Sequence, residues 1–257
     1  MDHVTTIQST ASPTRKQIAE KKRLLKLSRE QREVLVGLLL GDGHLSTQDN
    51  SRTYRLVYSQ SKERHGAYLE RVYGVFQDWT LGWPVLVKGH KGAGDGAELP
   101  PGRFRTKDRL KFTTVAHGSL RFYGKAFYKG GVKVVPKGIG RLLTARGLAY
   151  WYMDDGSIKS RQSKGLILNT HSFTLAEVEL LCKVLGSNFG LQAKPRPQTV
   201  PSGGQRHQIY ISGRSYERGR KIIGPHLLPE MMYKFPPPRK LRGANPIGGD
   251  ESVGGLA

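Results

Sequence analysis

Two aspartates occupy matched positions in two similar segments of the chain. Asp42 lies near the end of residues 35–43 and Asp155 near the end of residues 148–156; each follows an apolar, helix-like run and directly precedes a glycine. A carboxylate at the C-terminal end of a helix is unfavourable, because the helix dipole is negative there. One Asp-Gly pair after a helix is typical of an ordinary turn, but two copies, 113 residues apart, predict two half-sites that meet at one charged centre.

The acidic residues around the second segment are sparse. Between Arg109 and Ala176 the only acids are Asp154 and Asp155, within a long basic stretch. An isolated acidic pair in basic surroundings indicates a bound cation rather than general surface charge.

Small residues in the two segments favour close packing of the two helices. Gly37 and Gly41 lie in the first segment and Ala149 in the second. If they let the helices approach, the carboxylates of Asp42 and Asp155 project together. Their mutual repulsion then demands bound cations, and hard oxygen ligands favour Mg²⁺.

The charge of the whole chain points to a polyanionic partner. Its 257 residues include 42 Lys and Arg against 20 Asp and Glu, a formal net charge of +22, and the pI is near 10.2. Such an imbalance costs self-repulsion in a folded protein, so nucleic acid is the natural partner. A surface charged only for solubility is the alternative, but such surfaces usually mix signs and stay near balance.

Several other classes of site are excluded. The single cysteine, Cys182, rules out intramolecular disulfides and Cys-rich zinc sites, and its place on an apolar helix face predicts a small buried side chain. The eight histidines show no His-Glu-x-x-His spacing. No apolar run approaches the length of a membrane span, and no signal peptide is visible.

The predicted secondary structure repeats in the same order. Capping-box patterns open helices at Ser28 and at Thr174. The first copy is predicted to contain helices over 28–40, 65–79 and 119–128 and strands over 54–60, 85–88 and 110–115. The second copy is predicted to contain helices over 144–155, 174–185 and 215–228 and strands over 166–171, 191–196 and 207–212. The fold class is therefore α+β, with two copies joined around 136–141.

Residues 35–43 and 148–156 resemble the two signature helices of the LAGLIDADG homing endonucleases of the single-chain, two-motif type. Residues 168–174, 177–181 and 228–234 also read as that family, so the resemblance spans about 27–237. It implies two pseudo-symmetric αββαββα repeats whose antiparallel sheets form a DNA-binding saddle over the major groove. It also implies Mg²⁺-dependent cleavage of both strands at a long asymmetric site.

The resemblance divides the chain into four parts. Residues 1–26 form a basic N-terminal extension, residues 27–137 the first LAGLIDADG repeat, residues 138–240 the second repeat, and residues 241–257 a disordered, Gly-rich tail. The extension is open to two interpretations, a weak transit peptide or a disordered phosphate-binding arm.

The resemblance also implies the metal ligands. These are the carboxylates of Asp42 and Asp155, with the backbone carbonyls of Gly41 and Asp154 nearby. The chain departs from the family pattern in three places, where Leu40 and Met153 replace a variable acid and Tyr150 replaces a glycine of the motif.

Two lysines occupy matched positions after the third helix of each copy. Lys133 and Lys234 each precede a proline by two or three residues. A lysine fixed near paired metal ions can stabilise the charge that builds on a phosphate during attack by water. Most lysines in so basic a chain simply touch phosphate or solvent, but the position in both halves favours a catalytic role.

Gln60 and His171 end the strands that follow the two motifs, and either one is a candidate to hold water or to contact bases. Sequence readout is expected from basic side chains that alternate along the strands, because Arg suits bidentate contact with guanine while others only grip phosphate. The candidates are Arg55, Arg103, Arg105, Lys111, Lys194, Arg196 and Arg206.

The favoured function is a site-specific DNA endonuclease that acts as a monomer on double-stranded DNA, with no membrane partner. An RNA-binding intron maturase and a non-cleaving DNA-binding regulator on the same scaffold are the alternatives. Mg²⁺ is expected to support binding and cleavage and Ca²⁺ only binding, because Ca²⁺ coordination is looser. By resemblance, the expected setting is an organelle, mitochondrion or chloroplast.

Overall fold

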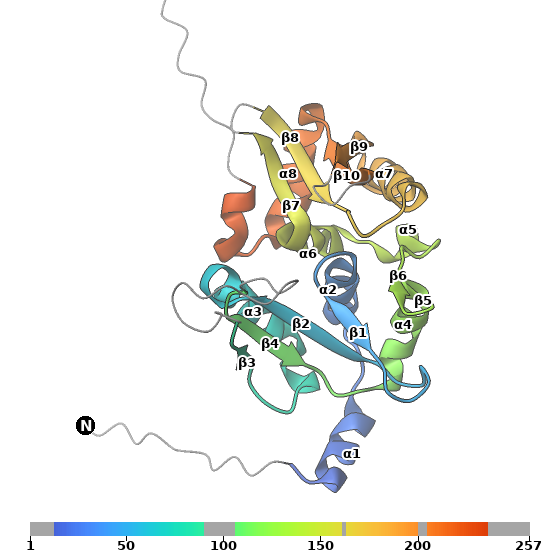
Figure 1. Cartoon of the computed structure of the whole chain (residues 1–257), viewed down its shortest axis with the longest axis vertical. Helices are drawn as coiled ribbons and strands as arrows, with labels where there is room; N and C mark the ends of the chain where they lie inside the picture. The colour runs from blue at the N-terminus through green and yellow to red at the C-terminus, as the bar shows by residue number, and fades with distance from the viewer. Residues whose placement is uncertain (1–12, 90–105, 161–162, 200–204, 236–257) are drawn as a thin grey trace, which may run out of the picture.

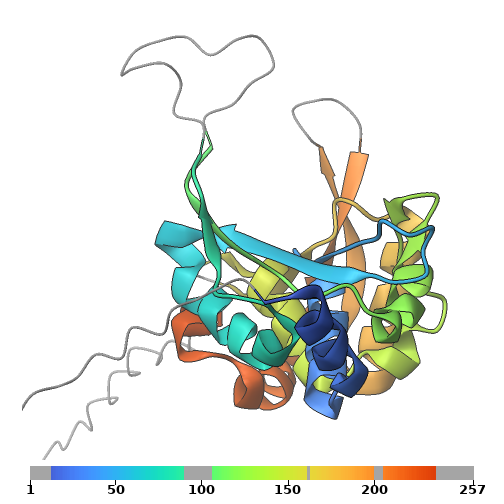
Figure 2. The ribbon, with the colours of Figure 1, turned by 90° about the horizontal axis from the view of Figure 1, so that it is seen from below.

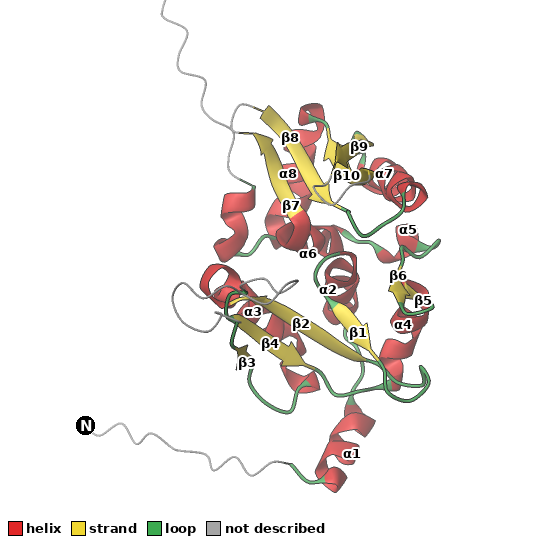
Figure 3. Ribbon diagram, viewed as in Figure 1, coloured by secondary structure: helices red, strands yellow, loops and turns green. Residues whose placement is uncertain are grey.

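The computed structural model describes residues 13–89, 106–160, 163–199 and 205–235. Two copies of one α+β unit make up most of it (Figures 1 and 3). The first copy comprises α2 (Arg29–Leu40), β1 (His44–Ser46), β2 (Arg55–Ser61), α3 (Lys62–Phe76), β3 (Val85–Val87), β4 (Arg109–Thr113) and α4 (Arg121–Phe127). The second comprises α6 (Ala145–Asp155), β7 (Gly156–Ser160), β8 (Ser163–Asn169), α7 (Leu175–Phe189), β9 (Ala193–Thr199), β10 (Gln205–Ile211) and α8 (Tyr216–Ile223). The predicted αββαββα repeat is therefore confirmed.

Each copy builds one four-stranded antiparallel sheet. The strand orders β1-β2-β4-β3 and β7-β8-β10-β9 are the same arrangement twice. Figure 2 shows the outer hairpins β3–β4 and β9–β10 projecting on one side of the molecule, with the helices on the other. β9 contains Pro195 and Pro197 and lies at a sheet edge, where a residue without an N–H group is tolerated.

The signature helices α2 and α6 pack directly against each other in the middle of the molecule (Figure 1). Their apolar faces are fully buried, which supplies the main free energy of association between the copies. A Cβ atom added at Gly37 would collide with the carbonyl of Gly147, and one added at Gly147 would lie 2.9 Å from the carbonyl of Glu33. The close approach thus depends on Gly37 and Gly147, which explains how Tyr150 is tolerated in place of the motif's glycine.

Shorter elements connect and extend the two copies. These are the helices α1 (Arg15–Leu24) and α5 (Ile139–Leu142), the hairpin β5 (Tyr128–Lys129) and β6 (Val132–Lys133), and the 3₁₀ turns η1 (Gln77–Trp79), η2 (Gly118–Leu120), η3 (Gly213–Ser215), η4 (Gly224–His226) and η5 (Pro229–Lys234). None of the helices in the described part of the chain is long and apolar enough to span a membrane.

Three details correct the sequence-based expectations. Part of the extension, interpreted from the sequence as either a weak transit peptide or a disordered arm, is the helix α1. This helix is opened by a capping box at Thr14 and held by a hydrogen bond from Lys21 Nζ to the Thr80 carbonyl. The strand predicted to end at His171 ends two residues earlier, at Asn169. The outer hairpin of the second copy is also longer than predicted, because β9 runs to Thr199. Residues 241–257 lie outside the described residues.

Candidate functional site

The ends of α2 and α6 bring three carboxylates to one place. α2 ends at Leu40, so Gly41 caps the helix and Asp42 follows it, whereas α6 runs to Asp155. The backbone N–H of Asp42 donates to Asp154 Oδ2 across the interface at 3.0 Å. A Cβ atom at Gly41 would lie only 2.5 Å from the same oxygen. Glycine at position 41 therefore makes room for the carboxylate of the other copy.

Asp154 is tied to the first copy by its side chain. Tyr58 donates to Asp154 Oδ1 at 2.6 Å and Tyr68 at 2.9 Å. Burial, followed by the charge of Asp42, nevertheless raises the pKa of Asp154 to about 7, although these hydrogen bonds oppose the shift. With three donors from the other copy, the Asp154 side chain joins the two repeats.

Asp155 has no such partners. Among the hydrogen bonds of the described residues, none is donated to its carboxylate. Burial and the charges of Asp154 and Asp42 raise the pKa of Asp155 to about 8, while Lys133 and Lys234 lower it. Ionising this group is costly because it is removed from water and lies beside two other carboxylates.

The oxygen ligands of the site suit a magnesium ion that is also bound by water and substrate, and they do not form a complete metal site by themselves. No group of three or more His, Cys, Asp or Glu side chains in the described chain is arranged to hold a metal ion by itself. Mg²⁺ is usually bound through one or two carboxylates together with water and substrate phosphate oxygens. Asp42, Asp155 and the neighbouring carbonyls supply hard oxygen ligands of that kind.

The two lysines bind backbone carbonyls beside the carboxylates. Lys133 Nζ donates to the carbonyls of Gly41 at 2.7 Å and Gly43 at 2.8 Å. Lys234 Nζ donates to the carbonyl of Asp154 at 2.7 Å and also to that of Met153. Burial lowers the pKa of both lysines, whereas the nearby carboxylates raise it. The carbonyls of Gly41 and Asp154, which were expected beside a metal ion, thus each accept a hydrogen bond from a lysine ammonium group.

Gln60 and His171 are placed very differently. Gln60 is buried and donates from Nε2 to Asp42 Oδ2 at 2.7 Å and to the Tyr58 hydroxyl at 3.0 Å. His171 lies beyond the end of β8 and bonds Gln198 on β9 at 2.8 Å. The hydrogen bonds of the structure join His171 to the outer hairpin, away from Asp155.

The strand-pairing registers explain why His171 is not the counterpart of Gln60. In the second copy, Gly156 pairs with Leu168. In the first copy, His44 pairs with Val57, so Tyr58 lies opposite Gly43, the counterpart of Gly156. Thr170, not His171, is therefore the counterpart of Gln60. Thr170 is buried and donates to the carbonyl of His207 at 2.7 Å.

Sequence reasoning missed several polar partners of the site. Tyr58 lies two residues before Gln60, so strand alternation places both on the same face of β2, and this signal was readable. In the second copy Asn169 donates to the backbone carbonyl of Asp155 at 3.1 Å. Tyr68 and His65 come from α3 and meet the site only through tertiary packing.

The predicted DNA-reading residues lie on the faces of the two sheets that point away from the core. In the first sheet, Arg55 and Lys111 alternate with buried residues of β2 and β4. In the second, Lys194 and Arg196 lie on β9 and Arg206 on β10. Arg109, which was not singled out from the sequence, lies beside Ser59 on the first sheet. The candidates Arg103 and Arg105 fall outside the described residues.

Comparison with known proteins gives consistent matches. Residues 32–218 match the model of the LAGLIDADG DNA endonuclease family. A probable intron-encoded endonuclease 1 of Wickerhamomyces canadensis is 30% identical over 84% of this chain and 87% of its own length. A cytochrome b mRNA maturase bI2 of Saccharomyces cerevisiae is 26% identical over 79% of this chain and 46% of its own length.

A solved structure shares the whole arrangement. The homing endonuclease I-WcaI, bound to its DNA recognition sequence, aligns with a TM-score of 0.74 and 26% identity, covering 88% of this chain and 94% of that one.

Proposed function

The chain belongs to the LAGLIDADG DNA endonuclease family, and we propose that it is a site-specific endonuclease that cuts both strands of a long asymmetric DNA target. The observation that carries the proposal is the meeting of Asp42 and Asp155 at the paired helix ends, with one lysine beside each. A protein that only binds nucleic acid needs neither the carboxylates nor the half-buried lysines.

Each residue of the site has a separate proposed role in cleavage. Asp42 and Asp155 are the proposed ligands of Mg²⁺, with the carbonyls of Gly41 and Asp154 as neighbours. A bound divalent cation offsets phosphate charge and lowers the pKa of a water molecule so that it can attack. Lys133 and Lys234 hold the backbone carbonyls at the ends of α2 and α6 in place, and their ammonium groups face the negative charge that grows on phosphate. Gln60 orients the Asp42 carboxylate through its hydrogen bond.

The sheets are the proposed DNA-binding surface. The I-WcaI structure holds its DNA recognition sequence, and the same fold here presents Lys194 and Arg196 on β9 and Lys111 on β4. With a formal net charge of +22, counterion release from DNA contributes strongly to binding.

The maturase alternative draws support from a relative that is named for cytochrome b mRNA. Because both aspartates and both lysines are present in this chain, we favour DNA cleavage as the activity. An organellar location is proposed on the same resemblance, and imaging of a tagged chain in its host tests it.

A randomised DNA library tests the function directly. The protein is incubated with the library and Mg²⁺, and the cut ends are sequenced. Ends that converge on one long asymmetric sequence support the proposal. Ca²⁺ in place of Mg²⁺ should preserve binding and stop cutting; robust cutting in excess EDTA would overturn the metal assignment.

A further inference from the structure

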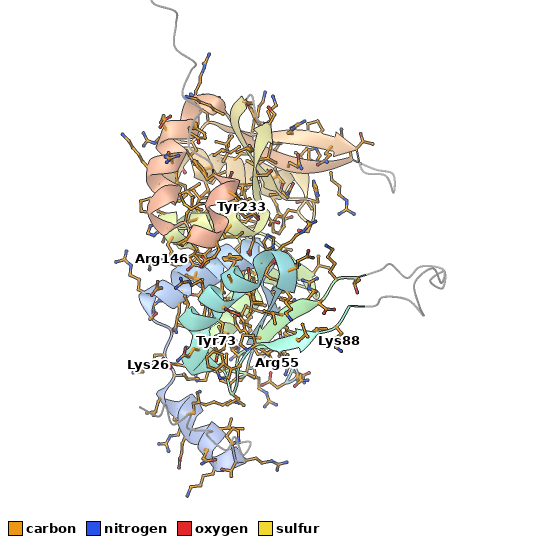
Figure 4. All side chains as sticks on the ribbon, turned by 90° about the vertical axis from the view of Figure 1, so that its left-hand side faces the viewer. Lys26, Arg55, Tyr73, Lys88, Arg146 and Tyr233 are labelled. Atoms are coloured by element: carbon orange, nitrogen blue, oxygen red, sulfur yellow. The ribbon has the colours of Figure 1, made fainter. Side chains whose placement is uncertain are left out.

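A chain of hydrogen bonds runs from Asp42 to the surface of the other repeat. Gln60 Nε2 donates to Asp42 Oδ2 at 2.7 Å, and Gln60 Oε1 lies 3.2 Å from His65 Nδ1. His65 Nε2 lies 2.9 Å from the hydroxyl of Tyr233. Tyr233 belongs to η5, beside Lys234, and Figure 4 shows it where the two repeats meet. The chain thus connects Asp42 of the first repeat to the residue that precedes Lys234 in the second.

The chemistry of the groups fixes the direction of every donor. An ionised carboxylate only accepts, so the amide nitrogen of Gln60 faces Asp42 and its oxygen faces His65. The Nδ1 atom of His65 must therefore carry the proton, and Nε2 of a neutral ring accepts from Tyr233. Burial, followed by the charge of Lys234, lowers the pKa of His65, although Asp42 opposes the shift. All donors point inward, toward the carboxylate.

The backbone around His65 is adapted to this contact. His65 lies in the first turn of α3 but has non-helical angles, φ −133° and ψ 18°. Its ring is half-buried and faces both Gln60 and η5. The helix α3 and the turn η5 share a second contact, an ion pair between Arg71 and Glu230 at 3.2 Å.

The second repeat has no equivalent chain. Thr170, the register counterpart of Gln60, is bonded to the carbonyl of His207. Within the described residues no side chain donates to the Asp155 carboxylate. Asn169 reaches only its backbone carbonyl. Side-chain support of the carboxylate is therefore confined to the Asp42 half.

We propose that His65 is a positioning residue for DNA cleavage: it orients Gln60, and through it Asp42, on the Asp42 side of the shared site. The inference rests on the proposed endonuclease function. Loss of the Nδ1 donor removes the hydrogen bond that holds Gln60 Oε1, so Gln60 orients Asp42 less firmly. One strand is then cut more slowly while the other is cut at nearly the normal rate.

Two substitutions separate the two bonds of His65. In His65→Asn the amide nitrogen takes the place of Nδ1, so the bond to Gln60 is retained. In His65→Gln the longer side chain places its amide near Tyr233 and loses the Nδ1 donor. Arg71→Gln is the matched control, because it breaks the other contact between α3 and η5 without touching the chain.

The first experiment is strand-resolved single-turnover cleavage of a supercoiled plasmid that carries the target. His65→Gln should slow one strand by about 10-fold or more, the usual effect of losing a group that orients a metal ligand, so nicked circles accumulate. His65→Asn and Arg71→Gln should cut both strands at close to the wild-type rate. Equal slowing of both strands by His65→Gln, or equal behaviour of His65→Asn and His65→Gln, would overturn the proposal.

The second experiment reads the histidine ring without any catalysis. Long-range ¹H–¹⁵N spectra of the metal-free protein, with His65 assigned by its absence in His65→Asn, should show the Nδ1–H tautomer. The Tyr233→Phe variant should shift the Nε2 resonance. An Nε2–H tautomer in the wild type contradicts the proposal even if cleavage is confirmed, whereas failure of the wild type to cut DNA would count against the endonuclease function alone.

Discussion

The two helix ends carry the same Asp-Gly pair, yet their surroundings differ. Asp42 is exposed and receives a hydrogen bond from Gln60. Asp155 is half-buried and depends on lysine charges at a distance. Asp154 belongs to the second copy but is bonded by tyrosines of the first. The backbone is thus repeated while the polar network exists in a single copy, which makes the two half-sites chemically distinct.

The two sheets also differ in the types of residue on their outer faces. On the first sheet, Val85 and Val87 of β3 pair with Lys111 and Arg109, and the valine side chains are 59% and 43% exposed. On the second, the Lys159 ammonium lies 5.4 Å from the centre of the Tyr210 ring. An apolar edge suits the methyl groups of thymine, whereas basic residues suit phosphate or guanine. We therefore expect the two halves of the target to be read by different contacts.

The largest expected effect comes from removing either carboxylate. Asp42→Asn or Asp155→Asn should slow cleavage by at least about 100-fold, the scale for losing one charge-stabilising group. DNA binding in Ca²⁺ should change little. Single-turnover cleavage measures the effect, with the surface variant Asp78→Asn as control. Near-normal cutting by either variant would show that the half-sites do not share a metal centre.

The lysines should come next. Lys133→Met and Lys234→Met are expected to slow cleavage by about 10- to 100-fold, as is typical for groups beside metal ligands, with only a small loss of affinity. The effects on the two strands should be unequal, because Lys133 holds both neighbours of Asp42 and Lys234 holds carbonyls on one side of Asp155. Lys125→Met, on the exposed face of α4, is the control. If both variants cut at the wild-type rate once bound, the lysines only grip DNA.

The raised pKa of Asp155 should also affect the pH dependence of stability. The pKa of Asp155 is raised from 3.8 to about 8, so between these values the folded state holds more protons than the unfolded state. The contribution of Asp155 to the free energy of unfolding of the metal-free protein therefore falls as pH rises from about 4 to about 8. Asp155→Asn should flatten this slope, and Mg²⁺ should raise the melting temperature more at the upper end. The same dependence of melting temperature on pH in Asp155→Asn and the wild type, in the absence of metal, would contradict the account.

The smallest effects should come from the sheet faces. If Arg196 contacts guanine, Arg196→Ala should weaken binding by about 1–3 kcal/mol and relax specificity at that position. If it contacts phosphate, the variant should lower the salt slope by about one unit. Val85→Ala should cost below about 1 kcal/mol, since few methyl contacts are lost, with an unchanged salt slope. Replacing thymine by uracil in the matching half of the target should mimic Val85→Ala. A salt-dependent loss for Val85→Ala would mean that the first sheet is not read through apolar contacts.

Much of this comparison could be predicted from sequence. The repeated apolar segments, the capping boxes and the matched lysines carry their information locally, so the fold and the pairing of Asp42 with Asp155 were readable. The role of Gly147 was missed because it precedes the motif. His171 was misplaced because strand β8 ends two residues earlier than its polar neighbours suggested. Tyr68, which binds Asp154, comes from a helix whose spacing reports only burial.

The most direct test of the account is to locate the metal. Crystals of the protein with its identified target DNA, grown in Mn²⁺ as an anomalous scatterer, should show anomalous density between the Asp42 and Asp155 carboxylates and beside the target phosphates. In the Asp42→Asn complex the anomalous density beside residue 42 should disappear. Bound target DNA with Mn²⁺ elsewhere, and none between the two aspartates, would contradict the assignment of a shared catalytic centre.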